Sequence, residues 1–493
     1  MKRTSLSIAG ILTLLIAASL SAATAADMVT KAPPPTTAVT APAACTGFWD
    51  FLVTSCPLSW YGITIYGTVD AGVTWQTHGT PYNGSLPAGA EYLIQKNSNR
   101  ALWNPANNAV SQSNIGVKGN EEFAPGWAFV FDLQANFNPY SLRLSNGPSS
   151  VAQNAGVPLT NQSSNGDSSQ AGQFYVGLGY VGVSSPYGTL TVFRQNTLRL
   201  EGIVAYDPMG GSNAFSPIGY QGASCGAGNT EDCRVSTSLK YRVDVGPFRA
   251  AALWQFGGYA QNNGANGGYS FQVGGDIPNL AKGVLSLDAI YTHITDAVSI
   301  GLSGNPLGPA GNPLPPFLPQ VLTATISNDA SIMLLAKYTN GPLKLYAGYE
   351  WIQFMPPSNP QTAFNDIAGD FLCHGCAAIN NTTIVNTAFD AHDKILQVFW
   401  TGAKYAVTDK LDVIGAYYHY DQNNFGAGAP CNTAAKATCS GTFDAVSFAV
   451  DWRFAAKFEA YAGFMFSQVN NGLANGYLNR NTIDPTVGLI FRF

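Results

Sequence analysis

Large apolar residues alternate with small or polar residues in many short segments of this sequence. In LKLYAGYEW, residues 343–351, the odd-numbered positions carry Leu, Leu, Ala, Tyr and Trp, and the even-numbered positions carry Lys, Tyr, Gly and Glu. Successive side chains of a β-strand point to opposite faces, so such a segment presents one face to an apolar phase and the other to water. The pattern predicts β-strands with two unlike faces.

The predicted strands come mostly in pairs, and the links between strands are alternately short and long. Seven segments each hold two strands and a short turn, at 113–137, 173–195, 235–256, 269–294, 330–354, 394–420 and 443–466, and single strands lie at 61–75 and 485–493, which makes sixteen strands. Short turns at one end and long loops at the other are typical of outer-membrane barrels. We therefore predict an all-β fold, a 16-stranded antiparallel transmembrane β-barrel with short periplasmic turns and long extracellular loops.

The composition supports this prediction. Only 11% of the residues are charged, whereas about 25% is usual in soluble domains. The mean hydropathy is nevertheless +0.03, and beyond the N-terminus no apolar run is long enough for a transmembrane helix. Aromatic residues near the predicted strand ends would form an interfacial belt: Trp351, Tyr417, Trp452 and Phe491. An exported soluble all-β binding protein is the less favoured alternative.

The N-terminus has the pattern of a secretory signal peptide. Lys2 and Arg3 precede an apolar stretch from Ile8 to Leu20, and small residues follow up to Ala26. We predict a signal peptide at 1–26, a Pro- and Ala-rich lead-in at 27–58 and the barrel at 59–493. Removal of the signal peptide changes the formal net charge from −5 to −7, and no basic stripe suggests a nucleic-acid partner.

Cysteine usage also suits an exported protein. The eight cysteines form four local pairs, which are Cys45 with Cys56, Cys225 with Cys233, Cys373 with Cys376, and Cys431 with Cys439. An even number at short spacing favours disulfides, although the connectivity rests on proximity alone. In FLCHGC, the C-x-x-C spacing leaves a redox or metal site as an alternative to a loop disulfide. Because the surrounding sequence has no thioredoxin-like pattern, the disulfide is favoured, and we predict no metal site and no cofactor.

Several segments resemble the general bacterial porins of the Gram-negative outer membrane. SNIGVKGNEEFAPG is similar to the early hairpin of that family, GTLTVFRQ to the strand before its pore-folding third loop, and CRVSTSLKY to the strand after that loop. The terminal Phe493 resembles the assembly signal of outer-membrane proteins. The resemblance implies a water-filled channel for passive diffusion of ions and small hydrophilic solutes. It also implies a homotrimer, contact with outer-membrane lipid and lipopolysaccharide, and recognition of the chain end by the barrel-assembly machinery.

The resemblance further implies that the third loop, residues 196–233, folds inward and narrows the pore. Glu201 and Asp207 would face basic wall residues across this constriction, and opposed charges would set a transverse field and a size limit. The remaining tentative constriction residues are Asn114, Lys118, Arg194 and Arg234, and Asn114 stands where such porins often place an Arg. For each charged residue, an ordinary solvated rim position is the alternative. A Cys225–Cys233 disulfide would anchor the end of the loop beside Arg234.

The sequence favours a channel over an enzyme or an energised receptor. An enzyme would need a nucleophile with a positioned base, and the five histidines lie in no recognisable catalytic frame. An energised receptor would need a plug domain, for which the lead-in is too short. A substrate-specific channel is the main alternative, because it would differ only in its lumen lining. The negative charge of the mature chain, with Asn114 neutral, leads us to expect weak cation selectivity.

Overall fold

The computed structural model describes residues 45–79, 81–82, 92, 94, 98–142, 177–219, 234–256, 267–303, 321–355, 379–380, 383–384, 392–436, 438–475 and 477–493. The described residues all belong to one compact unit, Ala44–Phe493. The predicted signal peptide, most of the lead-in and four of the cysteines lie outside the described residues; these cysteines are Cys225, Cys233, Cys373 and Cys376.

The sheet is a closed antiparallel barrel with sixteen strand positions. β3 and β4 together fill the second position, β20 and β21 fill the last, and β1 (Leu58–Trp60) is an additional edge segment. The other bounds are β2 (Ile63–Gly79), β3 (Arg100–Asn107), β4 (Asn114–Ala124), β5 (Trp127–Asn136), β6 (Leu178–Ser185), β7 (Gly188–Asn196), β8 (Arg234–Val245), β9 (Phe248–Gln255), β10 (Gly267–Leu280), β11 (Gly283–Ser303), β12 (Val321–Asn340), β13 (Leu343–Met355), β16 (Lys394–Thr408), β17 (Leu411–Gln422), β18 (Gly441–Ala455), β19 (Phe458–Asn471), β20 (Asn481–Ile483) and β21 (Thr486–Arg492). The predicted fold class is therefore confirmed.

The barrel closes where its last strand pairs with its first. β21 runs antiparallel to β2, from Thr68 opposite Arg492 to Thr74 opposite Thr486. Beyond this ladder, the Phe493 and Gly67 backbones exchange hydrogen bonds of 2.9 and 3.0 Å. Phe493 thus forms a further rung of the closing seam.

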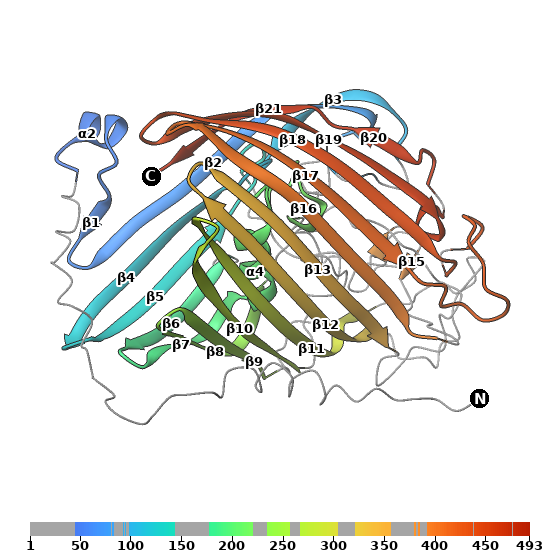
Figure 1. The fold of residues 1–493 in the computed structure, drawn as a ribbon, viewed down its shortest axis with the longest axis horizontal. Helices are drawn as coiled ribbons and strands as arrows, with labels where there is room; N and C mark the ends of the chain where they lie inside the picture. Colours follow the sequence, from blue (N-terminus) through green and yellow to red (C-terminus); the bar gives the residue numbers. More distant parts are fainter. Residues whose placement is uncertain are drawn as a thin grey trace. The chain divides into compact units, whose positions relative to one another are not determined.

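The links between strands separate the two ends of the barrel. Tight turns such as those at Gly126, Gly246 and Gly341 lie at one end, and each of these glycines has a positive φ, which a side chain would disfavour. The long link between β17 and β18, which the structure describes except at residue 437, leaves the other end (Figure 1). Strand faces alternate as predicted, because Tyr346 and Glu350 of β13 are buried in the lumen while Leu345 is exposed. In the residues that the structure describes, no helix is both long and apolar enough to cross a membrane.

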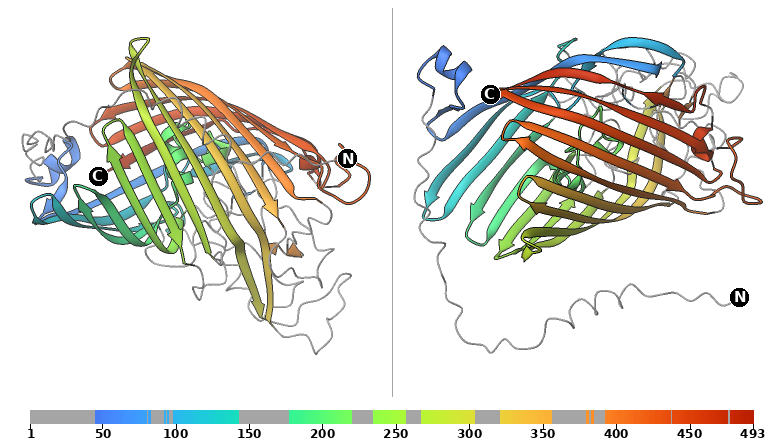
Figure 2. Two further views of the ribbon diagram at one scale, coloured as in Figure 1. Left: turned by 60° about the horizontal axis from the view of Figure 1, so that its bottom comes forward. Right: turned by 45° about the horizontal axis from the view of Figure 1, so that its top comes forward.

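A helix and the chain that follows it occupy the lumen. α4 (Leu198–Tyr206) begins directly after β7, and η3 (Pro217–Gly219) ends the described part of this segment. Figures 1 and 2 show α4 within the ring of strands. Its buried apolar residues and those of the inward strand faces form one cluster, which includes Ile203, Phe215, Met333 and Trp400. The hydrophobic core of this protein therefore lies inside the barrel, between α4 and the inward faces of the strands.

A short folded clip precedes the first barrel strand. α2 (Phe48–Val53) lies in a loop closed by a Cys45–Cys56 disulfide, and β1 then pairs with the start of β2. The described end of the predicted lead-in is thus packed on the barrel. A second predicted disulfide, Cys431–Cys439, closes the link after β17. The remaining elements are η6 (Gly472–Ala474) and a two-stranded pair, β14 (Ile379–Asn380) and β15 (Thr383–Ile384).

Candidate pore constriction

Helix α4 lies directly against the inner wall of the barrel. It starts at Thr197, whose side chain accepts a hydrogen bond from the backbone N–H of Leu200, as expected of an N-cap. A Cβ added at Gly202 would lie 2.7 Å from Cδ1 of Ile290 and 2.9 Å from Cδ1 of Leu335. A larger residue would require the ends of these two side chains to move, so Gly202 favours close packing of the helix on the wall.

Glu201 joins the first turn of α4 to the wall. Its carboxylate lies 2.6 Å from Nζ of Lys240 and also pairs with Arg242, and both of these residues belong to β8. The predicted loop carboxylate therefore meets basic wall residues by direct contact. Lys240 and Arg242 were not predicted, although their positions two apart on a strand place them on the same face.

The C-terminal end of α4 is held by a polar cluster on β9, β11 and β12. The Tyr206 hydroxyl donates to Asp288, and it accepts a 2.6 Å hydrogen bond from Arg249. Arg249 also binds the Asp288 carboxylate at 2.8 to 3.0 Å, and Lys337 donates to the Ala205 carbonyl at 3.2 Å. Burial raises the pKa of the Tyr206 hydroxyl above its usual range. The tyrosine remains a neutral donor, which fixes the helix end.

Asp207 follows the helix and turns the chain. Only 2% of the residue is exposed. Its carboxylate accepts hydrogen bonds from the Tyr418 hydroxyl at 2.6 Å and from the Gly211 backbone N–H at 2.8 Å. Burial raises its pKa, although these donors oppose the shift. Asp207 was predicted to face basic wall residues across the constriction. In the structure it is bonded to Tyr418 of β17 and lines the same cavity as Lys404, so its part in the constriction stays a prediction.

The far end of the segment docks on an inward excursion between β3 and β4. The Asn213 side chain donates to the Asn108 carbonyl, and the Ala214 N–H donates to the Ala109 carbonyl, both at 2.8 Å. The ring of Phe215 packs edge-to-face on Tyr461, with the centroids 6.2 Å apart. The segment therefore crosses the lumen between two anchored ends.

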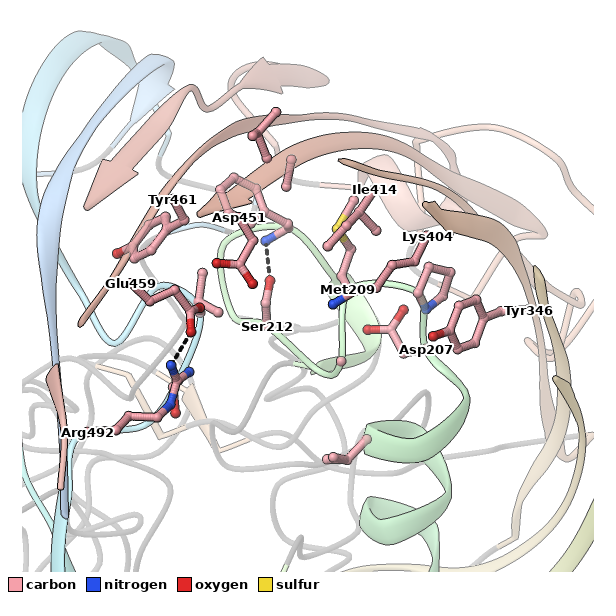
Figure 3. A pocket seen from close by; sticks show the side chains of 18 residues that line it. Asp207, Met209, Ser212, Tyr346, Lys404, Ile414, Asp451, Glu459, Tyr461 and Arg492 are labelled. Carbon is pink, nitrogen blue, oxygen red and sulfur yellow. Dashed lines mark hydrogen bonds and ion pairs between the residues drawn. The ribbon is translucent and has the colours of Figure 1, made fainter. Parts of the chain in front are cut away.

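Between this segment and the wall lies a cavity of about 370 Å³. Figure 3 shows Asp207 and Ser212 on the loop side, with charged residues of both signs on the wall. The charged wall residues that line the cavity are Lys404, Asp451, Glu459 and Arg492.

The basic wall residues of this cavity each have an acidic partner. Lys404 lies 2.8 Å from Asp412, and Arg492 pairs with Glu459. Arg453 also binds Asp412 at 2.8 Å and approaches Asp451 at 3.5 Å. The cavity is therefore polar and nearly balanced in charge, which suits hydrated solutes.

The other predicted constriction residues lie on the wall of β2 to β8. Asn114 opens β4, and its side chain donates to the Gln112 carbonyl at 2.8 Å. Lys118 lies over the Tyr66 ring at 5.1 Å. Arg194 is opposite Gly179 on β6, and Arg234 is opposite Asn196 on β7. Arg194 and Arg234 thus flank the two ends of the loop, and their part in the constriction stays a prediction.

A closed barrel that is narrowed by an inward-folded segment defines a membrane channel. The sequence model of the family described as Gram-negative porin matches residues 12–472, so the chain belongs to the Gram-negative porin family. The protein is therefore an outer-membrane channel for passive diffusion of small hydrophilic solutes.

Solved structures agree on the fold. An anion-selective porin from Comamonas acidovorans is 15% identical with a TM-score of 0.54, over 87% of this chain and 99% of that chain. OmpT, an outer-membrane protein of Vibrio cholerae, is 12% identical with a TM-score of 0.52, over 89% of this chain and 100% of the other. No curated protein matches the chain in sequence.

Proposed function

We propose that residues 197–219 form the size-limiting constriction of a general diffusion channel. The supporting observation is that this segment crosses the lumen and is anchored on opposite walls, through Glu201 on β8 and Asp207 on β17. A segment held in this way narrows the aqueous path without closing it. Liposome swelling with sugars of graded size would measure the cut-off. A variant that releases the segment should admit larger sugars, and an unchanged cut-off would contradict the proposal.

The charge distribution favours weak cation selectivity. The mature chain carries a net negative charge, and Lys404 and Arg492 in the cavity are each matched by a carboxylate. The reversal potential in a salt gradient across a planar bilayer would measure the preference. Lys404→Gln removes a positive charge and should shift the ion preference further toward cations. Glu459→Gln removes a negative charge and should shift the preference toward anions. A strong anion preference of the unaltered protein would contradict this assignment.

A substrate-specific channel is the second candidate function. The cavity beside Asp207 presents charged groups of both signs to one solute-sized space, a lining that suits selective binding as well as general passage. Current block by a panel of small zwitterions, sugars and carboxylates would separate the two. Saturable block by one class would favour a specific channel, and equal, unsaturated conductance would favour general diffusion.

We also infer that the protein is a channel without enzymatic activity and that it assembles as a homotrimer. His419 pairs with Asp444 at 2.8 Å, but both belong to the outward face of their strands, where Tyr417 also binds Asp444. This arrangement offers no nucleophile facing a solute path. Assays of phospholipid and peptide hydrolysis should show no turnover. Native mass spectrometry of the detergent-solubilised protein would test the trimer.

A further inference from the structure

A row of aromatic rings follows the outer face of the barrel at its short-turn end. Neighbouring ring centroids are 5.3 Å apart for Trp452 and Phe454, 6.0 Å for Phe454 and Phe458, and 5.0 Å for Phe458 and Phe491. Phe493 continues the row at 5.4 Å from Phe491. Rings at this height on the lipid-facing side of a barrel lie in the interfacial zone of the bilayer.

The row continues into the chain that precedes the barrel. We call residues 45–61 the N-terminal clip. The ring of Phe51 in α2 meets Phe491 at 6.1 Å and Phe493 at 6.0 Å. Nζ of Lys457 lies 3.7 Å from the Phe51 ring centroid and donates to the Cys56 carbonyl at 3.1 Å. Figures 1 and 2 show α2 beside the C-terminal end of the chain.

The clip lies on the outward side of the sheet. Phe491 is opposite Val69 in the closing ladder, and both side chains point away from the lumen, since Ile490 and Asp70 beside them are buried inside. A helix that rests on Phe491 is therefore outside the barrel. The Trp60 side chain of β1 also points outward. Trp60 is paired with Ile63 of β2, and Ile63 lies on the same strand face as Val69.

Five large apolar or aromatic side chains of the clip are exposed, four of them aromatic. The exposed fractions are 70% for Phe48, 75% for Trp49, 65% for Val53, 56% for Trp60 and 91% for Tyr61. The charged residue of the helix, Asp50, is bonded within the clip, because its carboxylate accepts from the Thr46 N–H at 2.8 Å. Such a concentration of exposed aromatic residues marks an interaction surface.

We propose that the N-terminal clip is an interfacial anchor whose Phe48, Trp49 and Trp60 side chains insert among the phospholipids of the periplasmic leaflet. The clip continues the lipid-facing aromatic row, so its exposed face meets the same phase as that row. Trp side chains favour the head-group zone, where the ring is in an apolar region and the N–H finds polar partners. The Cys45–Cys56 disulfide holds the helix against the seam, so the aromatic residues remain at the interface. The proposal rests on the outer-membrane location and not on the solute that the channel carries.

The test compares the access of a lipid-borne and a water-borne paramagnet to Trp49. The full-length mature protein is labelled with 5-fluorotryptophan and reconstituted in phosphatidylethanolamine and phosphatidylcholine nanodiscs. Trp49→Phe, a conservative change in the clip, assigns the ¹⁹F resonance. We expect a nitroxide lipid labelled near its head group to broaden Trp49 as strongly as Trp452, and a soluble gadolinium chelate to broaden it much less. Trp400, 2% exposed in the lumen, is the control that lipid should not reach.

Two outcomes would overturn the proposal. Strong broadening by the chelate with none from the lipid would place the clip in periplasmic water. If neither agent broadens the Trp49 resonance in the assembled protein, but broadening appears once the protomers are separated, a second copy of the chain covers the surface. Neither outcome would alter single-channel conductance, which tests the porin function separately. A Cys45→Ser and Cys56→Ser double variant should reduce the lipid-induced broadening of Trp49 while Trp452 is unchanged.

Discussion

The Tyr461 hydroxyl donates a 2.6 Å hydrogen bond to Oδ1 of Asp70 across the closing seam of the barrel. Oδ2 of the same carboxylate accepts from the backbone N–H groups of Val110 and Ser111, each at 2.7 Å. Asp70 therefore holds the inward excursion between β3 and β4, on which the far end of the constriction segment docks. Tyr461 contacts that tip directly through Phe215, so these two residues couple the seam to the pore.

Replacing Asp70 with Asn should loosen the constriction while the barrel stays folded. An amide has only one acceptor oxygen for these three donors. If that oxygen keeps the two backbone N–H groups, the NH₂ group faces the Tyr461 hydroxyl, which must then accept, and the buried hydroxyl proton loses its acceptor. An unsatisfied buried group costs about 1–3 kcal/mol, which is small beside the whole barrel. We expect noisier single-channel current and unchanged heat-modifiable migration. Tyr461→Phe is the milder comparison, because it keeps the ring against Phe215. If the single-channel current of Asp70→Asn is no noisier than that of the parent protein, the excursion between β3 and β4 does not hold the segment in place.

Replacing Glu201 with Gln should move ion selectivity toward anions. The variant removes the charge that balances Lys240 and Arg242 on β8, and their field would then act on passing ions. The measurement is the reversal potential in a potassium chloride gradient. Glu121→Gln is the matched control, since Glu121 is exposed at the short-turn end of β4 and on the outward strand face. An equal shift in both variants would mean that net charge, rather than the constriction, determines selectivity.

The buried Asp207 carboxylate should make docking of the segment depend on pH. Its pKa is raised by burial, so the docked state binds a proton more readily than the released state. This contribution is fully present below the ordinary aspartate pKa of 3.8 and is lost as pH rises through the raised value. We expect current fluctuations to increase from acidic to neutral pH.

Asp207→Asn isolates this effect from the other titratable groups around the cavity, of which Lys404 and Tyr346 lie beside Asp207 in Figure 3. The amide does not titrate, so the pH dependence of the fluctuations should flatten. The same slope in variant and parent would assign the dependence to another group. Single-channel noise spectra recorded over a pH series provide the measurement.

The sequence predicts the barrel well because strand alternation is a local signal. It does not predict β3, where Pro105 and the neighbouring Asn104 and Asn107 are residues that ordinarily mark a loop. In the structure, Pro105 pairs with Val73, and the lost N–H is tolerated where the second barrel strand breaks before the inward excursion.

The constriction is only partly predictable for a different reason. Strand parity places Lys404 and Arg492 on the inward face, so their approach to the lumen could have been inferred from the alternation alone. The Asp70–Tyr461 bond joins residues 391 positions apart, and no local pattern indicates it. Contacts of this kind depend on the register of the closed barrel, which only the three-dimensional structure shows.

Deletion of Phe493 should sharply reduce the yield of protein in the outer membrane. The deletion removes both backbone hydrogen bonds between residue 493 and Gly67. It also removes the Phe493 ring, which packs so closely on Gly67 that a Cβ added there would lie 2.5 Å from the ring. It also takes away one of the two rings on which the N-terminal clip rests. The family resemblance also predicts that the assembly machinery recognises this terminal aromatic residue. Phe493→Tyr keeps the ring and both backbone bonds, so its yield should stay near the parent level. Quantitative immunoblots of outer-membrane fractions measure both variants, and a normal level of heat-modifiable protein after the deletion would show that the seam closes and is recognised without Phe493.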